Sequence, residues 1–289
     1  MKIILTGTTG YISCCLEKWL TLKSSNFDLN KISVRGFSEN FQIPEAMDVL
    51  IHTAALVHEK ESSYTEKDYF DVNCSLTLQL AQKAKVVGVK HFVFLSTMAV
   101  YGIDGLDEGT MEIVESTPLD PATMYGKSKL AAERELMKLS DDDFVVSIIR
   151  PPMVYGPSCP GNYELLSKIA KKTPIFPLVQ NKRSMIFIDN LTEFMRQLII
   201  NRDEGIFHPQ DRKHIQTSDM VKEIANVHGR KIITSRLSGN LLMKMFGKKN
   251  IVSKVFGDLT YSKQLSKYRN NSYQIFDFKE AIKISELEK

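Results

Sequence analysis

The first thirteen residues place a short apolar run directly before a glycine turn and an amphipathic helix. Residues 3–5 are typical of a buried parallel strand, and Gly7 and Gly10 lie in the turn that follows. Helical spacing then relates Ile12, Leu16, Trp19 and Leu20. This order points backbone amides and a helix N-terminus at a pyrophosphate. The chain start therefore predicts a parallel α/β sheet with a dinucleotide site at its carboxyl edge.

Ser13 stands where the dinucleotide pattern usually has a third glycine. Serine is small, so the helix and the strand can still pack closely at this position. A purely structural turn is the alternative interpretation of this segment when it is taken alone.

Strands and helices are expected to alternate along the first half of the chain. The patterns predict strands at 2–6, 31–35, 48–52, 91–96 and 145–150, and helices at 11–22, 66–87 and 125–139. Such alternation gives a parallel sheet with helices on both faces. Residues 35–47 leave little room for a further helix and strand between the second and third strands.

Two groups of residues indicate acid/base chemistry. Tyr125 and Lys129 open a predicted helix four residues apart, so they share one helix face. A lysine ammonium beside a phenol favours the ionised phenol, whose ordinary pKa is about 10. Ser96 and Thr97 follow an apolar strand, at the edge where open α/β sheets bind ligands. The alternative for Tyr125 and Lys129 is chance spacing, and the alternative for Ser96 and Thr97 is an ordinary hydroxyl cap at a strand end.

These three segments, in this order, resemble the extended short-chain dehydrogenase/reductase family, and most closely its nucleotide-sugar epimerases and 4-keto reductases. The resemblance covers about residues 1–200. It includes further matches at 48–55, Asn73, 150–157 and 183–189. It implies a Rossmann-type doubly wound parallel sheet over residues 1–156, with contributions from about 183–200. A smaller C-terminal substrate lobe would be formed mainly by residues 157–289.

The resemblance also implies a function. It indicates an NAD(P)-dependent nucleotide-sugar oxidoreductase, either a 4-keto reductase or a C4 epimerase, acting on a UDP- or dTDP-sugar in surface-polysaccharide biosynthesis. Tyr125 would exchange a proton with the sugar oxygen, and Thr97 would hydrogen-bond the same oxygen. Lys129 would lower the pKa of Tyr125 and bind the nicotinamide ribose. The same three residues serve both reactions. A non-catalytic dinucleotide-binding regulatory or scaffold protein on this fold is the alternative.

The family pattern assigns site residues by position. The expected cofactor-binding residues are Gly7, Thr9, Gly10, Tyr11, Ile12, Arg35, Thr53, Ala54, Ala55, Asn73, Ser96, Tyr125, Lys129 and Pro151. Asn73 would also support the active-site backbone. The expected substrate-binding residues are Thr97, Asn162 and Arg183. The alternative for Asn162 is an ordinary loop asparagine. The alternative for Arg183 is an ion pair with Asp189.

The end of the second predicted strand bears on cofactor choice. NAD-selective members usually carry an acidic residue there, which binds the ribose 2′-hydroxyl. This chain has Arg35 instead, preceded by Ser33. A guanidinium can pair with a 2′-phosphate, so the cofactor is NADP or NAD, with NADPH favoured. A solvated arginine is the alternative.

Composition excludes several classes of protein. The 289 residues are 43% hydrophobic and 25% charged with a net charge of +4, which does not indicate nucleic-acid binding. No apolar run spans a bilayer, and the first strand starts almost at Met1 without a signal segment before it. The cysteines at 14, 15, 74 and 159 have neither metal-ligand nor disulfide spacing. We expect a cytoplasmic protein without a metal, with a homodimer as one option for assembly.

The segment from Lys244 to Arg269 carries seven basic residues and one acidic residue among several apolar ones. Such a segment can lie on a membrane surface. The favoured interpretation is that it caps the small lobe with snorkelling lysines.

Overall fold

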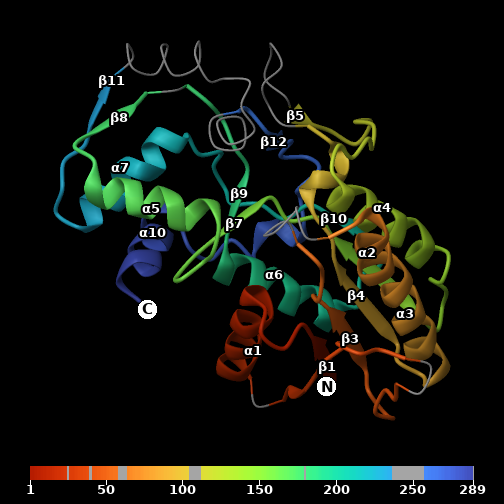
Figure 1. Ribbon diagram of the computed structural model, residues 1–289. Helices are drawn as coiled ribbons and strands as arrows, with labels where there is room; N and C mark the ends of the chain where they lie inside the picture. The colour runs from red at the N-terminus through yellow and green to blue at the C-terminus, as the bar shows by residue number, and fades with distance from the viewer. Residues whose placement is uncertain are drawn as a thin grey trace. The chain divides into compact units, whose positions relative to one another are not determined.

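The structure is a computed structural model that describes residues 1–24, 26–38, 41–57, 64–103, 112–178, 180–235 and 257–288. The chain forms two compact units (Figure 1). The first comprises Met1–Gly102, Pro118–Pro151 and Thr192–His208, and the second comprises Ile103–Thr117, Pro152–Leu191 and Pro209–Lys289.

A parallel sheet is the centre of the first unit. Its strand order is β10-β6-β4-β3-β1-β2, and every described pair in it is parallel. The strands are β1 (Lys2–Thr6), β2 (Asp28–Ile32), β3 (Val49–His52), β4 (His91–Leu95), β6 (Val145–Ile149) and β10 (Gly205–Phe207). Every residue of β3 and β4 is buried, as expected for strands covered on both faces. The predicted Rossmann-type α/β fold is confirmed.

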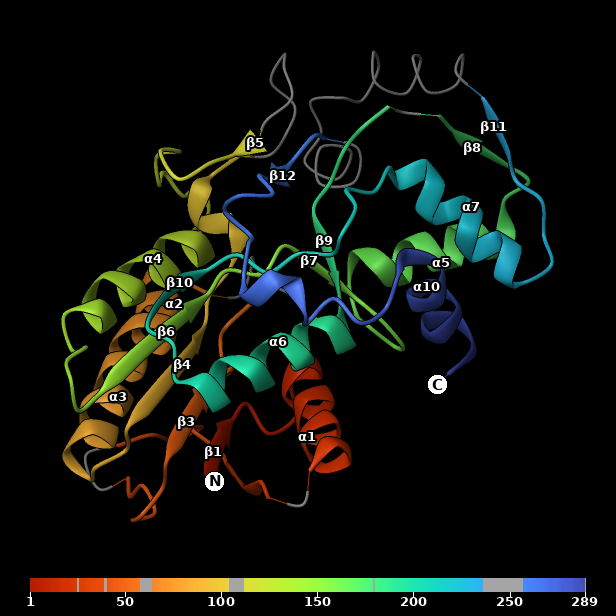
Figure 2. The same cartoon turned by 180° about the vertical axis from the view of Figure 1, so that it is seen from behind.

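Helices cover both faces of this sheet (Figures 1 and 2). On one face lie α2 (Glu66–Phe70), a π-helical turn (Asp71–Ser75), α3 (Leu76–Val86) and α4 (Met124–Met137). On the other lie α1 (Tyr11–Lys23) and the part of α6 (Ile188–Asn201) that belongs to this unit. The Trp19 indole of α1 donates to the Glu193 carboxylate of α6 at 3.0 Å, which ties the two helices together.

The second strand differs from its predicted position. β2 ends at Ile32, three residues before the predicted end, and Ile32 pairs with Thr6, the last residue of β1. Ser33 ends the strand, because its hydroxyl accepts the Arg35 amide at 3.3 Å and Gly36 follows with a φ of 73°. Residues 33–38 and 41–48, the described part of the connection to β3, contain no helix or strand. The expected omission of a helix–strand unit is therefore seen in these residues.

Three helices of the second unit meet at a buried carboxylate. They are α5 (Asn162–Lys172), α7 (Thr217–Val227) and α10 (Phe278–Leu287). Glu286 accepts hydrogen bonds from Tyr163 and Ser167 of α5 at 2.8 and 3.0 Å, and pairs with Lys171 at 2.6 Å and His228 at 2.8 Å. The carboxylate thus joins α10 to α5 and to the end of α7.

Short parallel strand pairs complete the second unit. They are β7 (Met153–Tyr155) with β9 (Met185–Phe187), β8 (Ile175–Pro177) with β11 (Ile233–Ser235), and β5 (Glu112–Ile113) with β12 (Thr260–Tyr261). Of the basic segment, 244–256 lie outside the described residues, while Leu259 and Tyr261 are buried. Among the described residues, no helix is both long and apolar enough to cross a bilayer.

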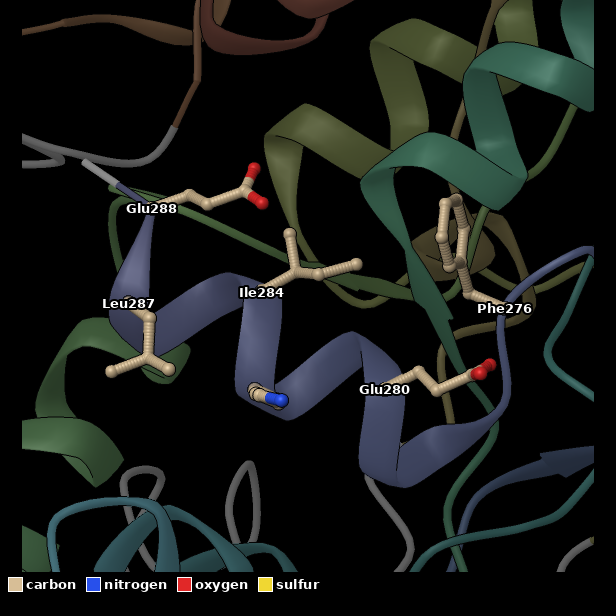
Figure 3. A pocket seen from close by; sticks show the side chains of 6 residues that line it. Phe276, Glu280, Ile284, Leu287 and Glu288 are labelled. Atoms are coloured by element: carbon tan, nitrogen blue, oxygen red, sulfur yellow. The ribbon is translucent and has the colours of Figure 1, made fainter.

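A cavity of about 320 Å³ lies along α10 in the second unit (Figure 3). It is lined by Phe276, Glu280, Lys283, Ile284, Leu287 and Glu288. None of these is a predicted site residue, so we do not assign the cavity to the candidate active site.

Candidate active site

The glycine turn after β1 has the geometry of a phosphate-binding turn. Gly7 has a φ of +75°, and a Cβ there would lie 2.6 Å from the Thr53 hydroxyl oxygen, so only glycine fits. The Gly10 amide donates to the Gly7 carbonyl at 2.8 Å. Gly10 makes no side-chain cap for α1, and the N-terminus of a helix can bind an anion through its first amides.

Ser13 closes the turn from inside the helix. Its hydroxyl lies close enough to bond to the Gly7 carbonyl and, at 2.8 Å, to the Gly10 carbonyl. The side chain is 1% exposed. The residue that departs from the glycine pattern is therefore small enough for close packing and also fixes the turn. These residues fit the diphosphate of a dinucleotide.

The loop after β3 is fastened to the end of β1. The Thr53 hydroxyl donates to the Thr6 carbonyl at 2.8 Å, and the Thr6 hydroxyl accepts the amides of Thr53 and Ala54 at 3.2 and 3.3 Å. These bonds hold Thr53, Ala54 and Ala55 beside the glycine turn, where the family pattern expects the cofactor.

Asn73 lies in the π-helical turn and is fully buried. Its side chain accepts the Leu56 amide at 2.8 Å and donates to the Leu56 carbonyl at 3.0 Å and to the Ser128 hydroxyl at 3.1 Å. The amide thus joins the loop after β3 to α4. Its predicted direct contact with a cofactor stays a prediction.

Thr97, Tyr125 and Lys129 come together at the carboxyl edge of the sheet. Thr97 follows β4 and accepts the Ala99 amide at 3.1 Å, which caps the 3₁₀ helix η3 (Met98–Tyr101). Tyr125 lies in the first turn of α4 and is hydrogen-bonded to Thr97. One turn further, the Lys129 ammonium donates to the Leu95 carbonyl at 2.8 Å and lies 4.3 Å from the Phe94 ring centroid.

Burial controls the protonation of both ionisable groups. It raises the pKa of Tyr125 to about 12, against the opposing effect of the Thr97 hydrogen bond. It lowers the pKa of Lys129 to about 7, against the opposing effect of the Glu133 charge. The sequence predicts that Lys129 lowers the pKa of Tyr125. Here the neighbour that lowers it is Thr97, because Lys129 is directed to the Leu95 carbonyl. Tyr125 is protonated at neutral pH and is suited to donate a proton.

Gly126 allows α4 to start close to η3. A Cβ at this position would lie 2.7 Å from the Ala99 carbonyl oxygen and 3.0 Å from the Pro121 Cβ. A larger residue would push the start of the helix, and Tyr125 with it, away from Thr97.

Four buried residues next to this site were not predicted as site residues from the sequence. Glu133 accepts a hydrogen bond from Ser96 and pairs with Arg150 at 2.6 Å. Arg150 also bonds Tyr101, which bonds His208. The spacing offered a signal, since Glu133 lies four residues after Lys129 on the same helix face. Ser96, predicted to face the cofactor, uses its hydroxyl to bond Glu133.

Arg35 and Pro151 flank the site on the same sheet edge. Arg35 is exposed just beyond the end of β2, and the Thr6–Ile32 pairing places that end level with the glycine turn. Pro151 follows β6, and its carbonyl accepts the Met98 amide at 3.1 Å. The cofactor roles of both residues stay predictions.

The other two substrate-binding candidates, Asn162 and Arg183, lie in the second unit. Arg183 is buried and donates to the Gly257 carbonyl at 2.8 Å. Burial lowers its pKa to about 10, and the charge of Asp258 opposes this shift. Asn162 is the exposed first residue of α5. In the part of the chain that the structure describes, no cluster of three or more possible metal ligands occurs.

The glycine turn, the Rossmann-type sheet and the Thr–Tyr–Lys group together define a chain of the dinucleotide-binding short-chain dehydrogenase/reductase class. The model of the NAD dependent epimerase/dehydratase family matches residues 3–208. The chain belongs to this family, which confirms the resemblance seen in the sequence.

Relatives of known name include two 4-epimerases. The chain is 32% identical to UDP-glucose 4-epimerase of Vibrio cholerae, over 89% of this chain and 86% of that protein. It is 27% identical to N-acetyl-alpha-D-glucosaminyl-diphospho-ditrans,octacis-undecaprenol 4-epimerase of Escherichia coli O157:H7, over 88% and 83% of the two chains. In fold, it is similar to RMD from Pseudomonas aeruginosa complexed with NADPH, with a TM-score of 0.73, 15% identity, and coverage of 99% and 98%.

Proposed function

We propose that the protein is a nucleotide-sugar 4-epimerase that uses a nicotinamide dinucleotide. One observation carries the proposal. Thr97, Tyr125 and Lys129 meet at the sheet edge in a chain that is 32% identical to a UDP-glucose 4-epimerase along most of both lengths. Their convergence favours an enzyme over the non-catalytic scaffold alternative, which needs no such group.

The chemistry divides between cofactor and protein. A bound nicotinamide supplies hydride transfer at the sugar carbon. Oxidation needs Tyr125 as the tyrosinate, which the positive charge of a bound oxidised nicotinamide would favour. Tyr125 would then take the proton of the C4 hydroxyl and return it when the ketone is reduced. Thr97 holds Tyr125 through their hydrogen bond and binds the same sugar oxygen. An epimerase performs this exchange twice, on opposite faces of the ring.

A 4-keto reductase is the second candidate, and Arg35 favours it. The exposed guanidinium at the end of β2 suits a 2′-phosphate, and a reductase consumes NADPH. The substrate class has two options as well. A sugar on a nucleoside diphosphate and a sugar on undecaprenyl diphosphate, the group named for one relative, share the diphosphate and the pyranose.

The experiment that separates the two reactions is to denature the purified protein and analyse the nucleotides it releases. Retained NAD supports the epimerase, which regenerates its cofactor in each cycle. A protein that releases no nucleotide and takes up NADPH supports the reductase. A protein that neither releases nor binds a dinucleotide contradicts both.

For the 4-keto reductase, the second candidate, we expect Arg35→Ala to reduce the preference for NADPH. Loss of a charge-assisted bond to the 2′-phosphate costs about 1.5–3 kcal/mol, so NADPH affinity falls roughly 10- to 100-fold while NADH affinity changes little. Titration of both cofactors into the apo protein at one ionic strength measures this. Lys31→Ala is the matched control, since Lys31 lies in β2, four residues before Arg35, and pairs with Glu17 of α1 at 2.7 Å. Equal binding of NADH and NADPH by the wild type refutes the assignment.

We expect Arg183→Ala to raise KM for the diphosphate sugar with a smaller effect on kcat. A phosphate clamp acts equally in the ground and transition states. Arg183 also holds the Gly257 carbonyl at 2.8 Å, so kinetic values are referred to the folded fraction measured by circular dichroism. If the folded fraction binds substrate as the wild type does, Arg183 has only a structural role.

A further inference from the structure

A buried polar network lies beside Thr97 and Tyr125, with the Glu133–Arg150 ion pair at its centre. Arg150 Nη2 donates to Glu133 Oε2 at 2.6 Å, and Arg150 Nε donates to the two carboxylate oxygens at 3.1 and 3.2 Å. The two side chains are only 2% and 5% exposed. The Ser96 hydroxyl donates to Glu133 Oε1. Both carboxylate oxygens are therefore used as acceptors.

The network continues from Arg150 across the sheet edge. Arg150 Nη1 donates to the Tyr101 hydroxyl at 2.8 Å, and that hydroxyl is 2.8 Å from His208 Nε2. Burial lowers the pKa of His208 to about 3, so this ring is neutral near pH 7. The chain of bonds thus joins α4 to the ends of β4, β6 and β10 within the first unit.

Thr97 lies between two residues that the network holds. Ser96 precedes it and bonds Glu133, and Tyr101 ends the 3₁₀ helix that Thr97 caps. Lys129 holds the Leu95 carbonyl at 2.8 Å just before this stretch. Segment 95–101 is therefore fixed at its start and its end by buried charged side chains, two of which belong to the helix that carries Tyr125.

A buried ion pair often adds little net stability over an apolar pair of the same volume, but it defines one geometry of its partners. We propose that Glu133 is a positioning residue, which fixes segment 95–101 through Ser96 and Arg150 and so keeps Thr97 in place against Tyr125. The link to catalysis rests on the proposed function, whereas the link to the geometry of the segment does not.

Two substitutions test this role from different ends. Ser96→Ala removes the bond between Glu133 and the segment but leaves the Glu133–Arg150 pair intact. Glu133→Gln replaces one acceptor oxygen by a donor and leaves the Arg150 charge without its partner. Glu133→Gln can fail to fold for that reason, and Ser96→Ala then carries the test alone.

Ser147→Ala is the matched control. Ser147 is a fully buried serine of the same sheet, whose hydroxyl bonds His91 at 2.6 Å and the Asp203 carbonyl at 2.5 Å. These bonds lie toward the opposite end of the strands from Thr97, because His91 is the first residue of β4. The control removes two side-chain bonds, against the one that Ser96→Ala removes, and leaves segment 95–101 untouched.

Hydrogen exchange and kinetics give two separate results. We expect Ser96→Ala and Glu133→Gln to increase amide exchange in peptides covering residues 96–102 at least several-fold, with no such change in Ser147→Ala. We expect kcat to fall about 10- to 100-fold, the cost of a small misplacement at a reacting centre, with KM and cofactor affinity within about two-fold of wild type.

The outcomes separate the two proposals. Unchanged exchange at 96–102 overturns the positioning role, whatever the substrate is. An equal loss of kcat in Ser147→Ala also overturns it, because the effect is then one of general stability. If Ser96→Ala and Glu133→Gln exchange faster at 96–102 but the wild type has no activity on sugar diphosphates, the positioning role stands and the proposed function is wrong.

Discussion

Tyr125→Phe is expected to lower kcat by about 10²–10⁴-fold, the usual contribution of a positioned acid or base. Tyr125 is the phenol that meets Thr97, and burial raises its pKa to about 12, so it holds its proton at neutral pH. Phenylalanine keeps the ring and removes only the hydroxyl. Cofactor affinity is therefore expected to stay near the wild-type value.

The cost in stability should be small compared with the cost in rate. Loss of one side-chain hydrogen bond reduces the free energy of unfolding by about 1 kcal/mol. Thermal unfolding monitored by circular dichroism checks this, and Tyr64→Phe, an exposed tyrosine of the same unit, is the control for loss of a phenol elsewhere. Turnover within a few-fold of wild type would remove Tyr125 from the mechanism.

The first unit is expected to lose stability steeply as the pH falls below about 6.5. Burial lowers the pKa of His52 to about 3, of His91 to about 4 and of His208 to about 3, whereas the same side chains titrate near 6.5 when unfolded. The unfolded unit therefore binds more protons between these values, and acid favours it. Each histidine contributes about 1.4 kcal/mol per pH unit, so the three together give roughly 4 kcal/mol per pH unit.

The second unit contains a carboxyl group, Asp211, whose pKa shift favours the folded state in acid. Burial raises the pKa of Asp211 to about 6, while its ordinary value is 3.8. As the pH falls, the folded state therefore binds this proton before the unfolded state does. The stabilisation is fully present below pH 3.8 and is lost as the pH rises through 6. Tyr155 and Asn190 both donate to this carboxylate at 2.8 Å. Acid should accordingly weaken the first unit before the second.

Trp19 allows the first unit to be followed separately. It is the single tryptophan of the chain and lies in α1. Urea unfolding monitored by tryptophan fluorescence from pH 7 to pH 5 gives the change in the free energy of unfolding per pH unit. His91→Gln, which keeps an amide group near the Ser147 hydroxyl, should reduce that slope by about one third. A free energy of unfolding that is flat over this range would show that the three buried histidines do not control the acid stability of the first unit.

The sequence predicted those parts of the site that depend on local patterns. The glycine turn, the hydroxyl residues after β4 and the Tyr125–Lys129 spacing each lie within one strand–turn or helix unit, where period and position decide the outcome. The end of the second strand was misplaced because a serine–backbone bond at Ser33, which has no hydropathy signal, ends it at Ile32.

Long-range contacts could not be read from the chain in the same way. Glu286 joins Tyr163, 123 residues away, and Arg150 joins Tyr101, 49 residues away. Such partners are fixed by packing rather than by spacing. Glu133 was within reach, since it continues the Tyr125–Lys129 face by one more turn, but a buried glutamate on an amphipathic helix is normally taken for an exposed one.

The proposed 4-epimerase uses Tyr125 to interconvert sugar epimers at C4 with no net consumption of cofactor. The most direct measurement is to incubate the protein with UDP-glucose, and in parallel with other diphosphate sugars, without added reductant, and to follow the C4 configuration by NMR. We expect the wild type to equilibrate the two C4 epimers of at least one of these sugars, while Tyr125→Phe leaves them unchanged over the same time. Absence of any epimer, with NADPH consumed in step with a 4-keto sugar, would contradict it.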